Sequence, residues 1–171
     1  MHILFVDDNH VWQKIALAKL PKLGCTVAVA GDGQQALDYL SSPPDQCPRP
    51  NLIMMDIAMP TLDGLETTHI LRTTAPFASD PQIRSTPIVG LCTTSLRADH
   101  ARFIARGMDD IIVKPWAVEQ IQPLLHWWAQ RRVVPRIGVI GLQQQQQRFA
   151  LRGEVWGGMG RGVYRGPRSR M

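Results

Sequence analysis

The sequence predicts an α/β protein built on a doubly wound parallel sheet. Two observations carry this prediction. Short apolar runs alternate with helical patterns from residue 2 to residue 128, and each run is continuous rather than alternating between apolar and polar residues. Continuous apolar runs are typical of parallel strands that helices cover on both faces. Five strand–helix pairs therefore indicate a five-stranded sheet whose crossovers are right-handed.

The elements follow one another in chain order. Runs rich in Val, Ile, Leu and Met predict strands at residues 2–7, 26–30, 51–56, 87–91 and 111–113. Helical spacing predicts helices at residues 10–22, 33–41, 63–73, 96–106 and 117–131. Asp63 and Gly64 are expected to begin the third helix, because aspartate caps helix N-termini and glycine permits close packing.

Prolines interrupt this pattern at two places, one in a connection and one in the last predicted helix. Residues 72–86 form a long connection, in which Pro76 and Pro81 should prevent a helix. Pro123 lies inside the last helical pattern, so we expect that helix to begin late or to kink.

The chain divides by composition into two parts. We expect a folded domain at residues 1–131 and a Gln-, Gly- and Arg-rich tail at residues 132–171, which is disordered because it cannot build a core. Residues 1–128 carry ten Lys or Arg and thirteen Asp or Glu, whereas residues 129–171 carry nine Arg and one acid. The net charge of +5 therefore originates in the tail. The tail could lack a dedicated role, bind nucleic acid weakly, or arise from a mispredicted gene end.

Composition also limits the cellular compartments in which we expect the protein. No apolar run nears the roughly 20 residues that a membrane-spanning helix needs. The three cysteines, Cys25, Cys47 and Cys92, have no metal-ligand spacing. We therefore expect a reduced protein of the cytoplasm, or alternatively of the nucleus, that has no membrane partner.

Acidic side chains and a lysine stand at the ends of three predicted strands. Asp7 and Asp8 follow the first apolar run, Asp56 ends the third, and Lys114 ends the fifth. The carboxyl ends of parallel strands meet at one edge of the sheet, where such folds place their ligand chemistry. Carboxylates bind hard cations such as Mg²⁺, and a carboxylate can attack phosphorus once its charge repulsion is offset. We expect the three acids to hold Mg²⁺, Asp56 to be the nucleophile, and Lys114 to pair with phosphoryl oxygens.

Together these motifs resemble the receiver domain of two-component response regulators. The likeness covers residues 2–128 and rests on Asp7-Asp8, Asp56, Met59-Pro60, Asp63-Gly64 and Lys114-Pro115. It implies a flavodoxin-like sheet of strand order 2-1-3-4-5 and a cis peptide bond before the proline of the last motif. The long connection at residues 72–86 is similar to the receivers of fungal hybrid histidine kinases.

The resemblance also implies roles for the site residues. Asp56 would accept a phosphoryl group from a phosphohistidine, with Mg²⁺ as the cofactor. Asp7 and Asp8 would hold the metal, the backbone carbonyl of Ala58 would be a further metal ligand, and Lys114 would contact the phosphoryl group.

Partners follow from the same resemblance. The phosphoryl donor would be a histidine kinase or a histidine phosphotransfer protein. Phosphorylation would then switch an interaction face within residues 92–116, including Leu96, Phe103 and Trp116, toward a downstream protein partner.

Two positions depart from the family pattern. Cys92 lies 22 residues before Lys114, where the family has Thr or Ser, and Ile111 replaces the usual switch aromatic. A thiol is a weak hydrogen-bond donor, so we expect a weaker phosphorylation-driven closure. A pseudo-receiver that binds partners without phosphorylation is therefore an alternative. A phosphohydrolase is the other rival, although Ala58 stands where such enzymes place a second acid.

Overall fold

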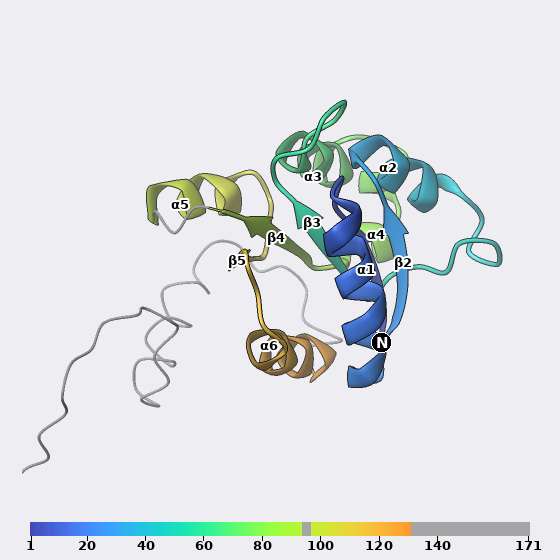
Figure 1. Ribbon diagram of the computed structural model, residues 1–171. Helices are drawn as coiled ribbons and strands as arrows, with labels where there is room; N and C mark the ends of the chain where they lie inside the picture. The colour runs from blue at the N-terminus through green and yellow to red at the C-terminus, as the bar shows by residue number, and fades with distance from the viewer. Residues whose placement is uncertain (94–96, 131–171) are drawn as a thin grey trace, which may run out of the picture. The chain divides into compact units, whose positions relative to one another are not determined.

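The computed structural model describes residues 1–93 and 97–130, whose core is a five-stranded sheet in the order β2-β1-β3-β4-β5 (Figure 1). The strands are β1 (His2–Val6), β2 (Thr26–Ala30), β3 (Leu52–Asp56), β4 (Ile88–Cys92) and β5 (Asp110–Val113). All neighbouring strands run parallel. The predicted fold class and strand order are therefore confirmed.

Helices cover both faces of this sheet. They are α1 (His10–Lys19), α2 (Gly33–Ser41), α3 (Gly64–Thr73), α4 (Pro81–Ser85), α5 (Arg97–Ala105) and α6 (Val118–Gln130), with 3-10 turns η1 (Leu20–Leu23) and η2 (Phe77–Ser79). Buried side chains of α1 and α6 join one hydrophobic cluster, whereas those of α2, α3, α4 and α5 join the other. Coverage on both faces explains why every residue of β3 and β4 is buried.

Some sequence predictions fall on parts of the chain that the structure does not describe. They are the tail at residues 132–171, the domain boundary that precedes it, and the position of Leu96 in the interaction face. Among residues 1–93 and 97–130, no helix combines the length and the apolar character that crossing a membrane requires.

The connection at residues 72–86 contains helix, so the prediction of a non-helical segment is wrong. Pro81 occupies the first turn of α4, where its missing N–H has no helical partner to lose. The side chain of Asp80 caps this helix by accepting hydrogen bonds from two backbone N–H groups. Phe77 and Ile83 are buried against the sheet, and this packing stabilises turns that are too short to form alone.

Pro123 does not delay the last helix. α6 begins at Val118, so the expected late start is wrong. A proline at this position removes one backbone hydrogen bond within the helix. Ile121 and Leu124, on either side of the proline, are buried in the core, and their burial outweighs the lost bond.

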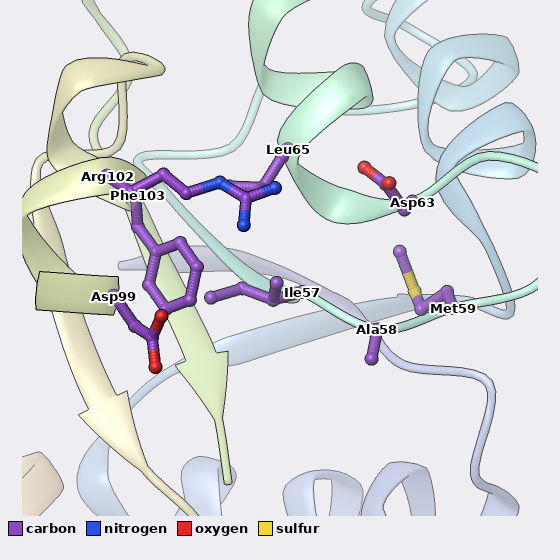
Figure 2. Close-up of a pocket in the computed structure, with 8 residues that line it drawn as sticks. All are labelled: Ile57, Ala58, Met59, Asp63, Leu65, Asp99, Arg102 and Phe103. Atoms are coloured by element: carbon purple, nitrogen blue, oxygen red, sulfur yellow. The ribbon is translucent and has the colours of Figure 1, made fainter. Parts of the chain in front are cut away.

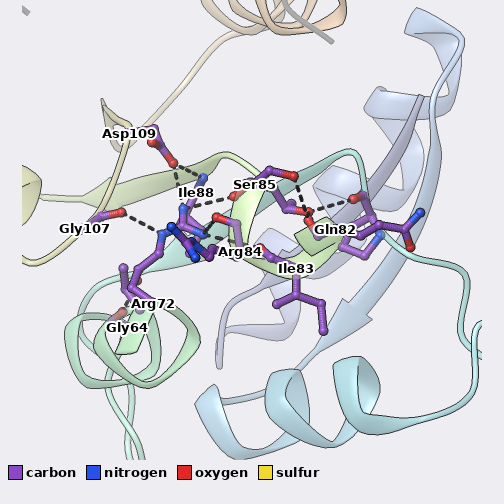
Figure 3. Close-up of polar contacts among 12 residues, drawn as sticks. Gly64, Arg72, Gln82, Ile83, Arg84, Ser85, Ile88, Gly107 and Asp109 are labelled. Atoms are coloured by element: carbon purple, nitrogen blue, oxygen red, sulfur yellow. Dashed lines mark hydrogen bonds and ion pairs between the residues drawn. The ribbon is translucent and has the colours of Figure 1, made fainter. Parts of the chain in front are cut away.

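At the amino ends of β4 and β5, the guanidinium of Arg72 connects α3 to both strands (Figure 3). Its Nη2 donates to a carboxylate oxygen of Asp109 at 2.8 Å and to the carbonyl of Thr86 at 3.0 Å. Its Nε donates to the carbonyl of Gly107 at 3.2 Å. The same oxygen of Asp109 accepts from the N–H of Ile88 at 2.8 Å. The cluster therefore joins α3, α4 and the starts of two strands through one cation.

Asp110 begins β5, and burial raises the pKa of its carboxyl to about 6. Because the folded pKa exceeds the unfolded value, the stability that this group contributes is present at low pH and lost as the pH rises through about 6.

Asp110→Asn keeps an oxygen that can accept a hydrogen bond from the N–H of Ile111, which lies 2.8 Å from the carboxylate of Asp110. We expect this change to raise the free energy of unfolding by about 1–3 kcal/mol at pH 7.5, with the gain fading toward pH 4. Urea denaturation at both pH values checks this, and an equal gain at both would contradict it.

Candidate functional site

Three carboxylates gather at the carboxyl edge of the sheet. Asp7 and Asp8 follow β1, and Asp56 is the last residue of β3. One carboxylate oxygen from each lies within 4.8 Å of the others. Asp7 is fully buried and Asp56 is 6% exposed, whereas Asp8 is exposed. The cluster therefore opens to solvent on the side of Asp8.

Strand register and local hydrogen bonds hold Asp7 in this position. Val6 of β1 pairs with Met55 of β3. Asp7 and Asp56, which follow these two residues, therefore lie at the same level of the sheet. The N–H of Asn9 donates to a carboxylate oxygen of Asp7 at 3.0 Å. The side chain of Gln13, on α1, donates to the carbonyl of Asp7 at 2.7 Å. The first turn of α1 is thus anchored to the acid that it follows.

Lys114, the residue after β5, joins two of the acids. Its Nζ lies 2.9 Å from a carboxylate oxygen of Asp7 and 2.8 Å from one of Asp56. Its side chain is only 8% exposed. Burial by itself lowers the pKa of Lys114, but hydrogen bonds and charges from Asp56 and Asp7 outweigh it and raise the pKa. The lysine therefore remains a cation. The Lys114–Pro115 bond is cis, as the family resemblance predicts.

The carboxyl of Asp56 is less easily ionised than an ordinary aspartate. Burial raises its pKa, Lys114 lowers it, the charge of Asp7 raises it, and the N–H of Ala58 lowers it, so that the pKa is raised overall. Three carboxylates face one ammonium group, which leaves an excess of negative charge among oxygen donors. This donor set fits a hard divalent cation such as Mg²⁺.

The loop between β3 and α3 is shaped by the predicted helix start. Asp63 caps α3 by accepting from the N–H of Glu66 at 2.7 Å. A Cβ at Gly64 would overlap the carbonyl oxygen of Asp56, so only glycine lets the helix approach the strand this closely. The sequence prediction for Asp63 and Gly64 is confirmed.

A groove of about 520 Å³ lies beside this loop (Figure 2). Residues 57–59, Asp63 and Leu65 form one side of it. Asp99, Arg102 and Phe103 form the other side, on α5. Its lining combines apolar side chains with the charged groups of Asp63, Asp99 and Arg102. Residues 57–59, which follow Asp56, therefore line the same groove as residues of α5.

The two positions that depart from the family pattern lie at the expected strands. Cys92 ends β4 and is 5% exposed, and its Sγ lies 3.9 Å from Nε2 of His100. The carbonyl of Cys92 accepts from the N–H of Lys114 at 2.6 Å, which connects the two strand ends. Ile111 lies on β5 and packs against the hydrophobic cluster of α2 to α5. Sequence reasoning assigned no chemistry to His100.

The expected interaction face is not a single surface. Phe103 is 6% exposed and belongs to the cluster on the α2 to α5 side of the sheet, whereas Trp116 is 4% exposed and belongs to the cluster on the α1 and α6 side. The placement of both on one face is therefore wrong. Sequence reasoning also missed Trp12, whose ring lies near Lys114. The available signal was its position in the first turn of the helix that follows Asp7 and Asp8.

Comparison with known proteins agrees with this geometry. The family model of the response regulator receiver domain matches residues 3–126. The chain belongs to the response regulator receiver family. A receiver is a phospho-accepting module of two-component signalling rather than a turnover enzyme, so the predicted class is confirmed and the phosphohydrolase is excluded.

Several relatives resemble this receiver. Protein PilG of Pseudomonas aeruginosa is 30% identical over 121 residues, which cover 71% of this chain and 82% of PilG. Transcription factor SKN7 of Saccharomyces cerevisiae is 32% identical over 132 residues, or 77% of this chain. The chain spans only 19% of SKN7 and 6% of Hybrid signal transduction histidine kinase I of Dictyostelium discoideum. The likeness to receivers of hybrid histidine kinases is confirmed and concerns one part of those proteins, whereas the fungal origin of the kinase stays a prediction.

A solved structure adds information on the site. The receiver domain of sensor histidine kinase PA1611 from Pseudomonas aeruginosa is 31% identical, with a TM-score of 0.62, and the match covers 75% of this chain and 97% of that one. That structure is described as having a magnesium ion coordinated in its active site cleft. The acidic cluster of this receiver is typical of such a Mg²⁺ site.

Proposed function

We propose that this receiver accepts a phosphoryl group from a phosphohistidine onto Asp56. The observation that carries the proposal is the contact of Asp56 with Lys114 at 2.8 Å inside a cluster of three carboxylates. Asp56 ends β3, which lies between β1 and β4 in the sheet. A phosphoryl group on its free oxygen would therefore lie within reach of β4 and Lys114.

The transfer forms a bond between a carboxylate oxygen of Asp56 and phosphorus, while the bond from phosphorus to the donor imidazole nitrogen breaks. The donor imidazole keeps the electron pair and takes up a proton. Lys114 is a cation already held at the site, so it can pair with a phosphoryl oxygen without a change of protonation. The role of these residues is to position the reactants and to balance charge.

Asp7, Asp8, Asp56 and the carbonyl of Ala58 would hold Mg²⁺. When bound, this cation would offset the repulsion between the carboxylate of Asp56 and the phosphoryl oxygens. The three oxygens within 4.8 Å of one another, and the magnesium described in the PA1611 receiver, support this assignment.

The donor would be a histidine kinase or a histidine phosphotransfer protein, and the output would be binding of a downstream protein. Cys92 stands at the end of β4, where a hydroxyl would bind the phosphoryl group more strongly than a thiol does. We therefore infer a receiver whose response to phosphorylation is weakened rather than lost. The pseudo-receiver is the second candidate, since both Cys92 and Ile111 favour it.

Intact-mass spectrometry after treatment with acetyl phosphate tests the proposal. We expect a gain of one phosphoryl group that requires Mg²⁺ and disappears when EDTA is added. Borohydride reduction of the labelled protein converts an acyl phosphate to an alcohol, and peptide mapping should find that change at Asp56. If acetyl phosphate and a phosphorylated histidine phosphotransfer protein both leave the mass unchanged, the chain is a pseudo-receiver. A label at another residue would remove Asp56 from the mechanism.

A further inference from the structure

The indole of Trp12 lies beside the ammonium group of Lys114. Nζ of Lys114 is 5.8 Å from the centroid of the ring, within the range of a cation–π interaction. Trp12 packs in turn against Trp116, with the ring centroids 5.6 Å apart, and Trp116 meets Phe5 edge-on at 6.3 Å. An aromatic stack from the core of the sheet therefore ends at the lysine of the site.

The start of α1, the helix that carries Trp12, is hydrogen-bonded to Asp7, one of the acids that Lys114 binds. Asn9 caps α1 by accepting from the N–H of Val11 at 2.9 Å, and its own N–H donates to Asp7. Gln13, the residue after Trp12, donates to the carbonyl of Asp7. Trp12 thus lies between Val11 and Gln13, and each of these two residues donates a hydrogen bond to a residue that precedes α1. Asp7 therefore contacts both Lys114 and the helix that carries Trp12.

Two carboxylates and this ring surround the ammonium group of Lys114. Its ammonium has three N–H donors, and two carboxylates accept from it in the present arrangement. A phosphoryl group on Asp56 would require the ammonium to turn from these carboxylates to a phosphoryl oxygen. The flexible four-carbon stem of lysine allows many other positions. The indole face of Trp12 attracts the cation and so limits the positions that it can take.

We propose that Trp12 is a positioning residue that holds the ammonium of Lys114 over the phosphoacceptor. This inference rests on the proposed function for the role of Lys114 in transfer. The contact itself exists in the unphosphorylated protein, so it can be measured without any transfer reaction.

The first test measures the reactivity of Lys114 in the unphosphorylated protein. A short pulse of an acetylating reagent, followed by peptide mass spectrometry, reports how readily each lysine amine is reached, with the exposed Lys22 as the internal reference. We expect Trp12→Leu to raise the labelling of Lys114 at least threefold relative to Lys22. Trp12→Phe retains an aromatic face and should stay within twofold of the wild type.

Trp128→Leu is the matched control. Trp128 is also a partly buried tryptophan that packs against the cluster of α1 and α6, but it lies on α6. We expect this variant to leave the labelling of Lys114 unchanged. Unchanged labelling in Trp12→Leu, or an equal rise in Trp128→Leu, would overturn the proposal. If Trp12→Leu does not fold, Trp12→Met takes its place with the same expectations.

The second test connects the contact to transfer through a double-mutant cycle. Trp12→Leu should slow phosphorylation by acetyl phosphate roughly three- to tenfold in the wild-type background and have no further effect in a Lys114→Met background. An equal slowing in both backgrounds would mean that Trp12 acts through the fold and not through Lys114. If the wild type takes up no phosphoryl group, the proposed function fails, whereas the labelling test still decides the role of Trp12.

Discussion

Asp56→Asn is expected to abolish the Mg²⁺-dependent gain of a phosphoryl group from acetyl phosphate. The amide has no anionic oxygen, so it can neither attack phosphorus nor contribute a negative charge to a bound cation. The substitution preserves the shape of the side chain, and it removes a carboxylate whose pKa burial raises. We therefore expect the melting temperature to be unchanged or higher. Intact-mass spectrometry and thermal unfolding measure the two effects.

Asp63→Asn is the matched control for this variant. Asp63 lies on the same loop and is exposed, and its carboxylate caps α3. Asparagine caps helices about as well as aspartate, so this change should leave both phosphorylation and stability unaltered. A phosphoryl gain that survives Asp56→Asn would assign the acceptor to another residue. A gain that is lost in both variants would indicate that the loop, and not the carboxylate of Asp56, limits the reaction.

Arg72→Met is expected to lower the free energy of unfolding by about 3–5 kcal/mol. The side chain of Arg72 is 7% exposed and donates to carbonyl groups from three segments as well as to Asp109. Methionine fills much of the same volume but donates nothing, so the carbonyl oxygens and the carboxylate of Asp109 lose the hydrogen bonds that the guanidinium donates. Urea denaturation of the full chain measures this loss of stability.

Arg84→Met serves as the comparison for Arg72→Met. Arg84 lies on α4 with an exposed side chain, so the same substitution should change the free energy of unfolding by less than about 0.5 kcal/mol. Because Arg72 binds at the amino ends of β4 and β5, its loss should leave the rate of phosphorylation of the remaining folded protein unaltered. A loss of stability below 1 kcal/mol would show that water replaces the guanidinium at little cost.

The sheet and the acidic cluster could be predicted from the amino-acid pattern. Continuous apolar runs identify parallel strands from local composition, and the topology of such a sheet brings their carboxyl ends to one edge. Asp7, Asp8 and Asp56 could therefore be placed together before any coordinates, and the structure brings their oxygens within 4.8 Å. The same logic placed Asp63 at the start of α3, because capping depends on neighbouring residues alone.

Most contacts between side chains of distant elements could not be predicted from local patterns. Lys114 bonds to Asp7 across 107 positions of the chain, and Trp12, at the end of an aromatic stack, lies beside Lys114 although no local pattern indicates it. The helix at residues 81–85 forms because Ile83 is buried in the core, although prolines argued against it. Phe103 and Trp116 pack on opposite faces of the sheet. The physical reason is common to all these cases: short-range preferences are worth less than burial and pairing, and the partners for both come from distant parts of the chain.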